Sequence, residues 1–250
     1  MATDSLIGVL DSAQLAGSGA SRWLTETETA DYAAIRNPRR QAEWLAGRIA
    51  AKYAFLHRGQ ASGPLALARI TREMIEPAED YRQVRVTKHP SPEGGAPGIG
   101  RRGAPVQARV AVSHAEGMAC AFIGGTGAYA IDLEFRKPRI AEFYRQNFSA
   151  RERAWVAASA GDELWLYTLL WSAKECLLKT PQFAALSLWD MPSIDLRILS
   201  GQAGLGRNST LESFTFLDAE ASSTASVRHR FELAVAGTAD LVLTAIPRLD

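Results

Sequence analysis

The sequence has little cysteine, almost no net charge and no long apolar run, and each shortage narrows what the protein can be. Cys120 and Cys176 are the two cysteines among 250 residues, too few for a disulfide framework or a cysteine-rich zinc site. We expect both to be small core residues in a reducing compartment. With 28 basic and 27 acidic side chains the net charge is +1, so no global field draws the protein to nucleic acid or to an anionic membrane.

Long hydrophobic stretches are also missing. No run approaches the ~18 apolar residues of a membrane span, and Met1–Leu10 has neither the basic start nor the apolar centre of a signal peptide. Apolar residues make up 47% and charged residues 22% of the chain, the balance of a soluble globular protein. We therefore expect a cytoplasmic protein without a membrane anchor.

The hydrophobic pattern predicts a mixture of helices and strands. A capping box begins one helix at Ser149 and Glu152. Two segments are predicted to be loops, the Gly/Pro-rich 88–105 and the polar 218–227. Helices are predicted at 28–36, 39–56, 150–158 and 162–179, and strands at 109–113, 118–123, 129–135, 194–199, 211–217, 231–236 and 241–246.

The glycine cluster at 124–127 is interpreted as a turn, because it lacks the lysine of a phosphate-binding loop and leads into a strand. We place a domain boundary there, which gives halves of 1–127 and 128–250. Each half is then expected to combine helices with an antiparallel sheet, an α+β fold. The amino-acid sequence shows no direct repeat between the halves.

Two carboxylates alternate with apolar residues in the strand predicted at 129–135. Side chains alternate along a strand, so Asp132 and Glu134 point to one face, and Ile131 and Leu133 point to the other. Two neighbouring carboxylates are tolerated on a solvated sheet edge or around a cation. Oxygen-only ligands favour Mg²⁺ over a transition metal.

The helix predicted at 162–179 places Glu175 and Lys179 four residues apart on one face. Alone, this spacing is as well explained by a surface ion pair. His114 lies at the end of a predicted strand. A lone histidine there is more often a hydrogen-bonded structural residue than a ligand or a base. Basic residues near the helix at 39–56 suit either a solvated face or a phosphate ligand; they are Arg36, Arg39, Arg40, Arg48 and Lys52.

The order of these segments resembles that of the phosphopantetheinyl transferases of the surfactin-synthetase-activating type, including the siderophore-synthetase branch. Four motifs and one link occur in the order found in this family, over about residues 36–180. They are Arg40–Arg48 (RQAEWLAGR), Val112–His114 (VSH), Ala130–Glu134 (AIDLE), the link Asn147–Ser149 with Glu152, and Trp171–Lys179 (WSAKECLLK).

The resemblance implies two pseudo-symmetric α/β subdomains with coenzyme A in the cleft between them. Asp132, Glu134 and Glu175 would hold Mg²⁺, or Mn²⁺, against the pyrophosphate of coenzyme A. Glu175, directly or through a metal-bound water, would deprotonate a serine of an apo acyl or peptidyl carrier protein, and Lys179 would assist the leaving 3′,5′-ADP. Coenzyme A contacts would come from Arg40, Arg48, Ser113, His114 and, without an assigned role, Lys174.

The segment before the Ser-His strand departs from the family pattern. A Gly-Lys-Pro or Gly-Arg-Pro motif is common there, whereas this chain has Gly103-Ala104-Pro105. Arg101 or Arg102 could supply the missing phosphate contact.

The resemblance also implies the partners. They are coenzyme A and a small acidic carrier domain, with docking contacts expected near Phe143, Phe148, Arg151 and Arg153. We expect a monomer that binds no nucleic acid. Two other functions stay open: a catalytically silent protein that binds coenzyme A or the carrier, and an unrelated Mg²⁺-dependent phosphohydrolase.

Overall fold

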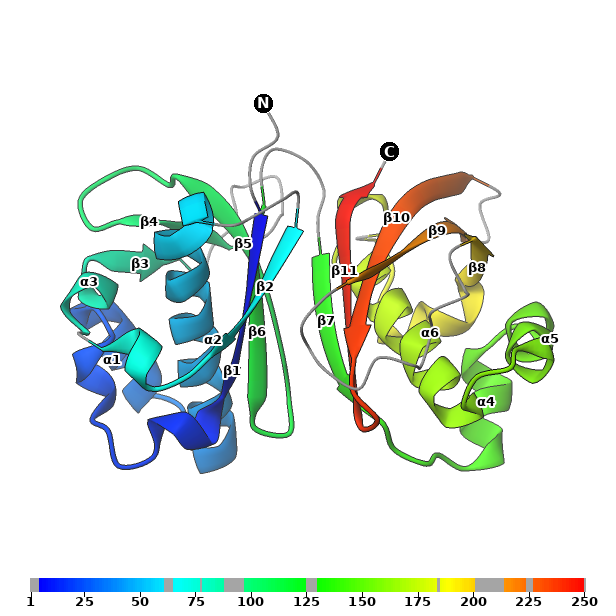
Figure 1. The fold of residues 1–250 in the computed structure, drawn as a ribbon, viewed down its shortest axis with the longest axis horizontal. Coiled ribbons are helices and arrows are strands. Elements are labelled where there is room, and N and C mark those ends of the chain that lie inside the picture. The colour runs from blue at the N-terminus through cyan, green and yellow to red at the C-terminus, as the bar shows by residue number, and fades with distance from the viewer. Residues whose placement is uncertain are drawn as a thin grey trace. The chain divides into compact units, whose positions relative to one another are not determined.

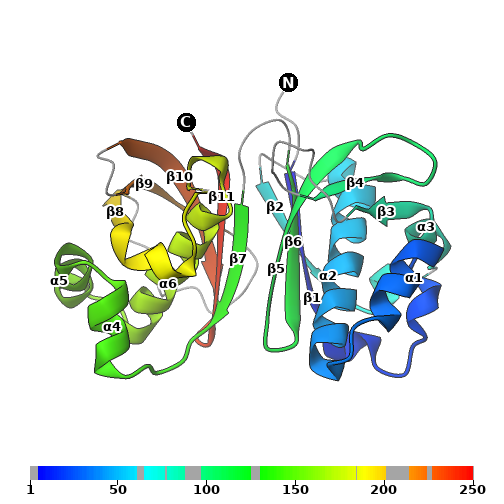
Figure 2. The ribbon, with the colours of Figure 1, turned by 180° about the vertical axis from the view of Figure 1, so that it is seen from behind.

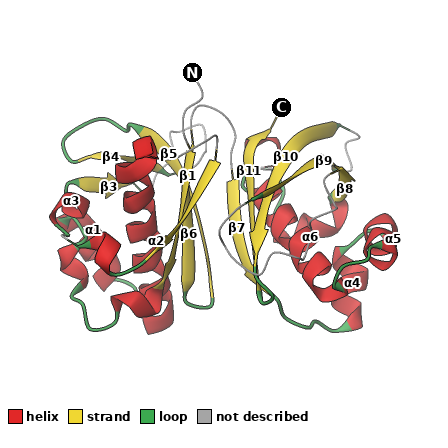
Figure 3. Cartoon of the chain, viewed as in Figure 1, coloured by secondary structure: helices red, strands yellow, loops and turns green. Residues whose placement is uncertain are grey.

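The computed structural model describes residues 5–60, 65–76, 78–87, 97–124, 130–183, 185–200, 214–223 and 227–249. Within them the chain divides into two compact units, an N-terminal unit of residues 1–126 and a C-terminal unit of residues 127–250. Each unit combines one β-sheet with helices (Figures 1 and 3). The fold is therefore mixed α+β, as the sequence predicts.

The N-terminal unit contains a six-stranded sheet in the order β2-β1-β6-β5-β4-β3. Its long helix, α2 (Pro38–His57), packs along the sheet (Figure 2). The other helices are α1 (Glu26–Ala33) and α3 (Glu79–Arg82). The strands are β1 (Ser5–Asp11), β2 (Leu65–Ile70), β3 (Val84–Val86), β4 (Gly98–Arg101), β5 (Ala108–Ala115) and β6 (Met118–Gly124).

Local sequence explains where α2 begins and how closely it packs. The Asn37 side chain accepts a hydrogen bond from the backbone of Arg40, and Pro38 occupies the first turn, where no backbone donor is lost. At Gly47 a Cβ atom would lie 3.0 Å from Cγ1 of Val112 in β5. The glycine therefore allows the helix and the strand to approach closely.

The C-terminal unit contains a five-stranded antiparallel sheet in the order β7-β11-β10-β9-β8. Helix α6 (Glu163–Leu178) packs against β7 and β11 and is preceded by α4 (Ala141–Asn147) and α5 (Ala150–Ala158). The strands are β7 (Ala130–Phe135), β8 (Asp195–Ser200), β9 (Thr215–Ser222), β10 (Arg228–Gly237) and β11 (Leu241–Leu249).

Each unit contains its own copy of a buried framework, which consists of a capping box and a lysine. In the N-terminal unit, Glu28 closes a capping box with Thr25 and accepts a 2.6 Å hydrogen bond from Nζ of Lys52. In the C-terminal unit, Glu152 closes a capping box with Ser149 and accepts a 2.9 Å bond from Nζ of Lys174. Each lysine lies on the long helix of its unit and is fully buried.

The backbone partners of the two frameworks also correspond. Lys52 donates to the carbonyl two residues before its capping threonine, at Trp23, and Lys174 donates to the carbonyl two residues before its capping serine, at Asn147. The second glutamate oxygen accepts from the backbone of β3 at Val86 in one unit and of β8 at Leu196 in the other. The structure thus contains the pseudo-symmetry that the family resemblance implies, although the sequence shows no direct repeat.

The repeat aligns the first strand of each unit at a constant offset of 124 residues. Trp23 corresponds to Asn147, and Gly8 in β1 then corresponds to Asp132 in β7. Gly8 is paired with Ala121 of β6, as Asp132 is with Thr244 of β11. The N-terminal unit therefore has a glycine where the C-terminal unit has a carboxylate.

The predicted helices are confirmed to within three residues at each end. The turn between β5 and β6 contains two residues with positive φ angles, Glu116 and Gly117. Three predictions about strands are wrong. β4 lies in the predicted loop 88–105, β9 continues to Ser222 into the predicted loop 218–227, and β1 pairs with β2 in parallel. The parallel pairing follows from α2, which crosses over between the two strands. The glycine cluster at 124–127 lies mostly outside the described residues.

Cys120 and Cys176 are fully buried, as predicted for core residues. Among the residues that the structure describes, no helix is both long and apolar enough to cross a membrane.

Candidate active site

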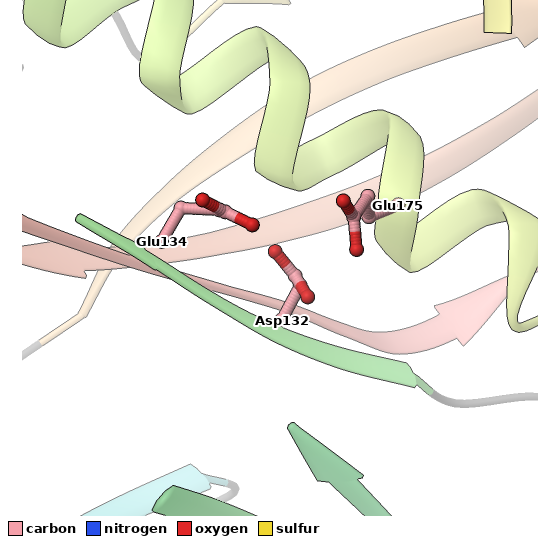
Figure 4. Close-up of side chains that lie close together, drawn as sticks. All are labelled: Asp132, Glu134 and Glu175. Carbon is pink, nitrogen blue, oxygen red and sulfur yellow. The ribbon is translucent and has the colours of Figure 1, made fainter. Parts of the chain in front are cut away.

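Three carboxylates meet between β7 and α6 in the C-terminal unit. Asp132 and Glu134 come from β7 and Glu175 from α6, and each offers an oxygen within 4.8 Å of the others. Figure 4 shows the three side chains directed toward a common region between the strand and the helix. Asp132 is 1% exposed, so the alternative of a solvated carboxylate face is wrong for this residue.

Both oxygens of Asp132 are held by hydrogen bonds. Oδ1 accepts a 2.8 Å bond from Nζ of Lys179, and Oδ2 accepts a 2.8 Å bond from Oγ of Ser172. Nζ of Lys179 also donates to the carbonyl of Ile131 at 2.9 Å. The lysine and the serine together fix the orientation of this carboxylate.

The other two carboxyl groups carry strongly raised pKa values. Burial, then the charges of Asp132 and Glu175, raise the pKa of Glu134 to about 8. Burial, then the charge of Asp132, raise the pKa of Glu175 to about 7. Lys179 opposes both shifts without cancelling them. The cluster therefore has more negative charge than its protein surroundings neutralise.

This donor set fits a divalent cation with a preference for oxygen. Three carboxylates that converge within one ion's reach are typical of Mg²⁺ or Mn²⁺ ligands. Burial and mutual repulsion both raise the pKa values of Glu134 and Glu175, and a cation among the three carboxylates would counter both effects. Asp132, Glu134 and Glu175 are thus able to hold such an ion.

The raised pKa values predict how stability depends on pH. Folded Glu134 and Glu175 titrate near 8 and 7, above the ordinary value of 4.5, so between these limits the folded protein binds more protons than the unfolded chain. The free energy of unfolding of the metal-free protein should therefore fall by several kcal/mol as pH rises from 5 to 8.

Urea unfolding in EDTA across this pH range measures the effect. Glu134→Gln removes the group with the larger shift, so its curve should be flatter than that of the wild type. A wild-type stability that rises over the same range would contradict the assignment of these pKa values.

Lys179 ends α6 and reaches back to the strand. Burial opposes its charge, but the charge and hydrogen bond of Asp132 outweigh burial, and its pKa is raised above the ordinary lysine value. Lys179 is therefore a permanent cation beside Asp132. Its side chain is 35% exposed, which leaves it accessible to a ligand.

The structure places Lys174 away from this cluster. Its ammonium group is buried and donates to Glu152 and to the carbonyls of Asn147 and Met191. Burial lowers the pKa of Lys174 and raises that of Glu152, while their attraction opposes both shifts. The contacts of Lys174 are thus those of a framework residue.

The predicted residues of the N-terminal unit lie on α2 and β5. Nη1 of Arg48 donates to the carbonyl of Val86 at 3.1 Å, and its guanidinium lies 4.7 Å from the centre of the Trp44 ring. Burial lowers the pKa of Arg48, against the opposing charges of Glu28 and Asp31. The side chain of Arg40, in the first turn of α2, is exposed. Arg101 and Arg102 are exposed as well.

Ser113 and His114 occupy the end of β5, and Glu43 connects this end to α2. Ser113 is 9% exposed, whereas the side chain of His114 is about half exposed. Oε1 of Glu43 accepts bonds from Arg39 and from the backbone of Gly117, and Oε2 lies 3.7 Å from Nδ1 of His114. Glu43 therefore anchors the turn that positions the histidine.

Four residues around the carboxylates were not predicted from the sequence. Ser172 and Thr244 are buried beside Asp132. Lys137 and Arg139 line a small, open hollow next to Glu134, together with Trp171. The basic pair follows the acidic strand directly in the sequence, a signal that could have found it, whereas Thr244 is about 110 residues away.

Of the expected docking contacts, Phe148 is buried in the core, so this part of the prediction is wrong. Arg151 pairs with Asp195, and Arg153 donates to backbone carbonyls.

Comparison with known proteins bears on the C-terminal unit. No curated protein matches the sequence. Residues 128–236, which include β7 and α6 with all three carboxylates and Lys179, match the model of one protein family. That family is the 4′-phosphopantetheinyl transferase superfamily, so the C-terminal unit carries a domain of this superfamily.

Proposed function

We propose that the protein is a Mg²⁺-dependent transferase of the surfactin-synthetase-activating type. It would transfer the 4′-phosphopantetheine arm of coenzyme A to a serine of an apo carrier protein and release 3′,5′-ADP. The main support is the convergence of Asp132, Glu134 and Glu175 with Lys179 inside the segment that matches the superfamily.

The reaction forms one bond and breaks one. The serine oxygen attacks the β-phosphorus of coenzyme A, the bond between that phosphorus and the bridging oxygen breaks, and the oxygen departs with 3′,5′-ADP. The serine proton must go to a base, and charge accumulates on the leaving phosphate. Magnesium, when bound, would neutralise charge on the pyrophosphate.

Glu175 is the candidate base. Its carboxylate projects from α6 toward Asp132 and Glu134, and with a cation in the cluster it would be ionised at neutral pH and able to accept a proton. Lys179 keeps its positive charge and is partly exposed, which suits it to stabilise the leaving 3′,5′-ADP. The positive charges of Lys137 and Arg139 beside Glu134 would favour an anionic ligand at the hollow.

The N-terminal unit would bind the nucleotide part of coenzyme A. Arg48, Ser113 and His114, with Arg40 on the first turn of α2, are the proposed contacts to the 3′-phosphate and the adenosine. The half-exposed His114 and the exposed Arg40 are accessible to a ligand. Lys174 is proposed to be a framework residue, because its donors are used inside the protein.

The intact mass of a carrier domain tests the proposal. Purified protein is incubated with coenzyme A, Mg²⁺ and a panel of apo carriers, and we expect a mass gain of one phosphopantetheine arm. Addition of EDTA should reduce the rate by at least ~100-fold, because the carboxylates repel the pyrophosphate without a cation. Substantial transfer in EDTA would contradict the metal assignment.

Two other outcomes would replace the proposal. Coenzyme A binding without transfer to any carrier would indicate a catalytically silent homologue. Release of free phosphate from coenzyme A or nucleotides would indicate a phosphohydrolase.

A further inference from the structure

A chain of buried hydroxyl groups leads from Asp132 into the sheet. Oγ of Ser172 on α6 donates to Oδ2 of Asp132 at 2.8 Å and lies 2.8 Å from Oγ1 of Thr244 on β11. Sγ of Cys176 lies 3.3 Å from the same Thr244 oxygen. Ser172, Thr244 and Cys176 are all fully buried.

The chemistry of the groups fixes the direction of the hydrogen bonds. The charged carboxylate of Asp132 can only accept, so the single proton of the Ser172 hydroxyl is directed to it. The bond between the two hydroxyls must then be donated by Thr244. Thr244 thereby polarises Ser172 and strengthens its bond to the carboxylate.

The N-terminal unit provides a comparison within the same molecule. It repeats the buried lysine-glutamate framework, at Lys52 and Glu28, but not the hydroxyl chain. Alignment on the buried lysines matches Ala50 with Ser172, and strand pairing matches Ala121 with Thr244. Gly8 occupies the position of Asp132. Both hydroxyls are thus absent where the carboxylate is absent, although the framework is kept.

We infer that Ser172 and Thr244 are positioning residues that orient Asp132 for the cation, rather than general parts of the fold. Lys179 restrains Oδ1 and the hydroxyl chain restrains Oδ2, so both oxygens keep a fixed direction. A ligand held by hydrogen-bonded neighbours binds metal more tightly than a mobile one, typically by 10–100-fold. The inference rests on the proposed metal site.

Mn²⁺ binding to the protein, followed by the electron paramagnetic resonance signal of free Mn²⁺, tests the inference without any turnover. Thr244→Val keeps the shape of the side chain and removes the hydroxyl, so we expect its dissociation constant for Mn²⁺ to rise about tenfold. Thr244→Ser restores a hydroxyl and should return the constant to within about twofold of the wild type. Ser172→Ala, a second and smaller change, should act like Thr244→Val.

Thr180→Val is the matched control. Thr180 is also a fully buried threonine, but its hydroxyl donates to the carbonyl of Leu177 at 2.7 Å and not toward the carboxylates. Its Mn²⁺ affinity should therefore equal that of the wild type.

The transfer assay gives a second measurement for Thr244→Val. The Mg²⁺ concentration that gives half the maximal rate should rise by a larger factor than the factor by which kcat falls at saturating Mg²⁺.

The outcomes separate this inference from the proposed function. If the wild type binds Mn²⁺ and both Thr244→Val and Ser172→Ala bind it equally well, the positioning role is overturned alone. If Thr180→Val weakens binding as much as Thr244→Val, the effect is general destabilisation and the inference is again overturned. A wild type that binds no Mn²⁺ overturns the metal site itself.

Discussion

Glu175→Gln should lose at least ~10³-fold in transfer rate while it gains stability in the absence of metal. Removal of a general base costs 10²–10⁴-fold, and loss of a metal ligand adds to this. The same substitution removes a carboxylate whose pKa is raised to about 7 by burial and by Asp132. At pH 8 the folded protein no longer has to hold that charge, so the free energy of unfolding should rise by about 3 kcal/mol.

Intact-mass transfer assays and urea unfolding in EDTA at pH 8 measure the two effects. Glu163→Gln is the matched control, because Glu163 is an exposed glutamate on the same helix, in its first turn. It should match the wild type in both measurements. Near-normal transfer by Glu175→Gln would show that the assigned roles are wrong, and an unchanged stability would show that the carboxylate is not strained in the folded state.

Lys174→Met should lower the free energy of unfolding by about 3–5 kcal/mol, the usual cost of leaving one member of a buried ion pair without its partner. Glu152 would stay buried and keep its hydrogen bonds from the backbone of Ser149 and Leu196, but it would lose its cationic partner. Lys52→Met removes the corresponding lysine of the N-terminal unit and should cost about the same. Chemical unfolding of both variants measures the two losses.

Lys174→Met also tests whether Lys174 belongs to the buried framework or to the coenzyme A site. Below the unfolding transition, we expect Lys174→Met to bind coenzyme A with the wild-type KM, because its ammonium group is enclosed by protein atoms. A raised KM with unchanged stability would instead assign Lys174 to the coenzyme A site.

The sequence predicted the parts of the structure that depend on local pattern. The extent of helix α2 to within one residue, the capping box at Ser149, and the placement of Asp132 and Glu134 on one face all follow from neighbouring residues. Periodicity and capping act over a few residues, so one sequence is enough to read them.

Contacts between distant residues could not be read in this way. The sequence identified Glu152 as a capping residue but did not predict its contact with Lys174, which lies 22 residues further along the chain. Thr244 lies in an apolar strand whose pairing with β7 sets it opposite Asp132. No strand was predicted before residue 109, so β1, β2 and β3 were missed. The parallel pairing of β1 with β2 could not be read either, because it depends on the crossover through α2.

The glycine at position 8 has a consequence for how the two units divide their tasks. A Cβ atom there would lie 2.9 Å from Cδ1 of Ile70 and 3.1 Å from the carbonyl oxygen of Ala50. Ile70 belongs to β2, the strand for which the C-terminal unit has no described counterpart. An acidic side chain at position 8 would therefore require the Ile70 side chain and the backbone of α2 at Ala50 to shift. A second carboxylate site in this unit would thus need adjustment of the neighbouring strand and helix, and not the replacement of Gly8 alone.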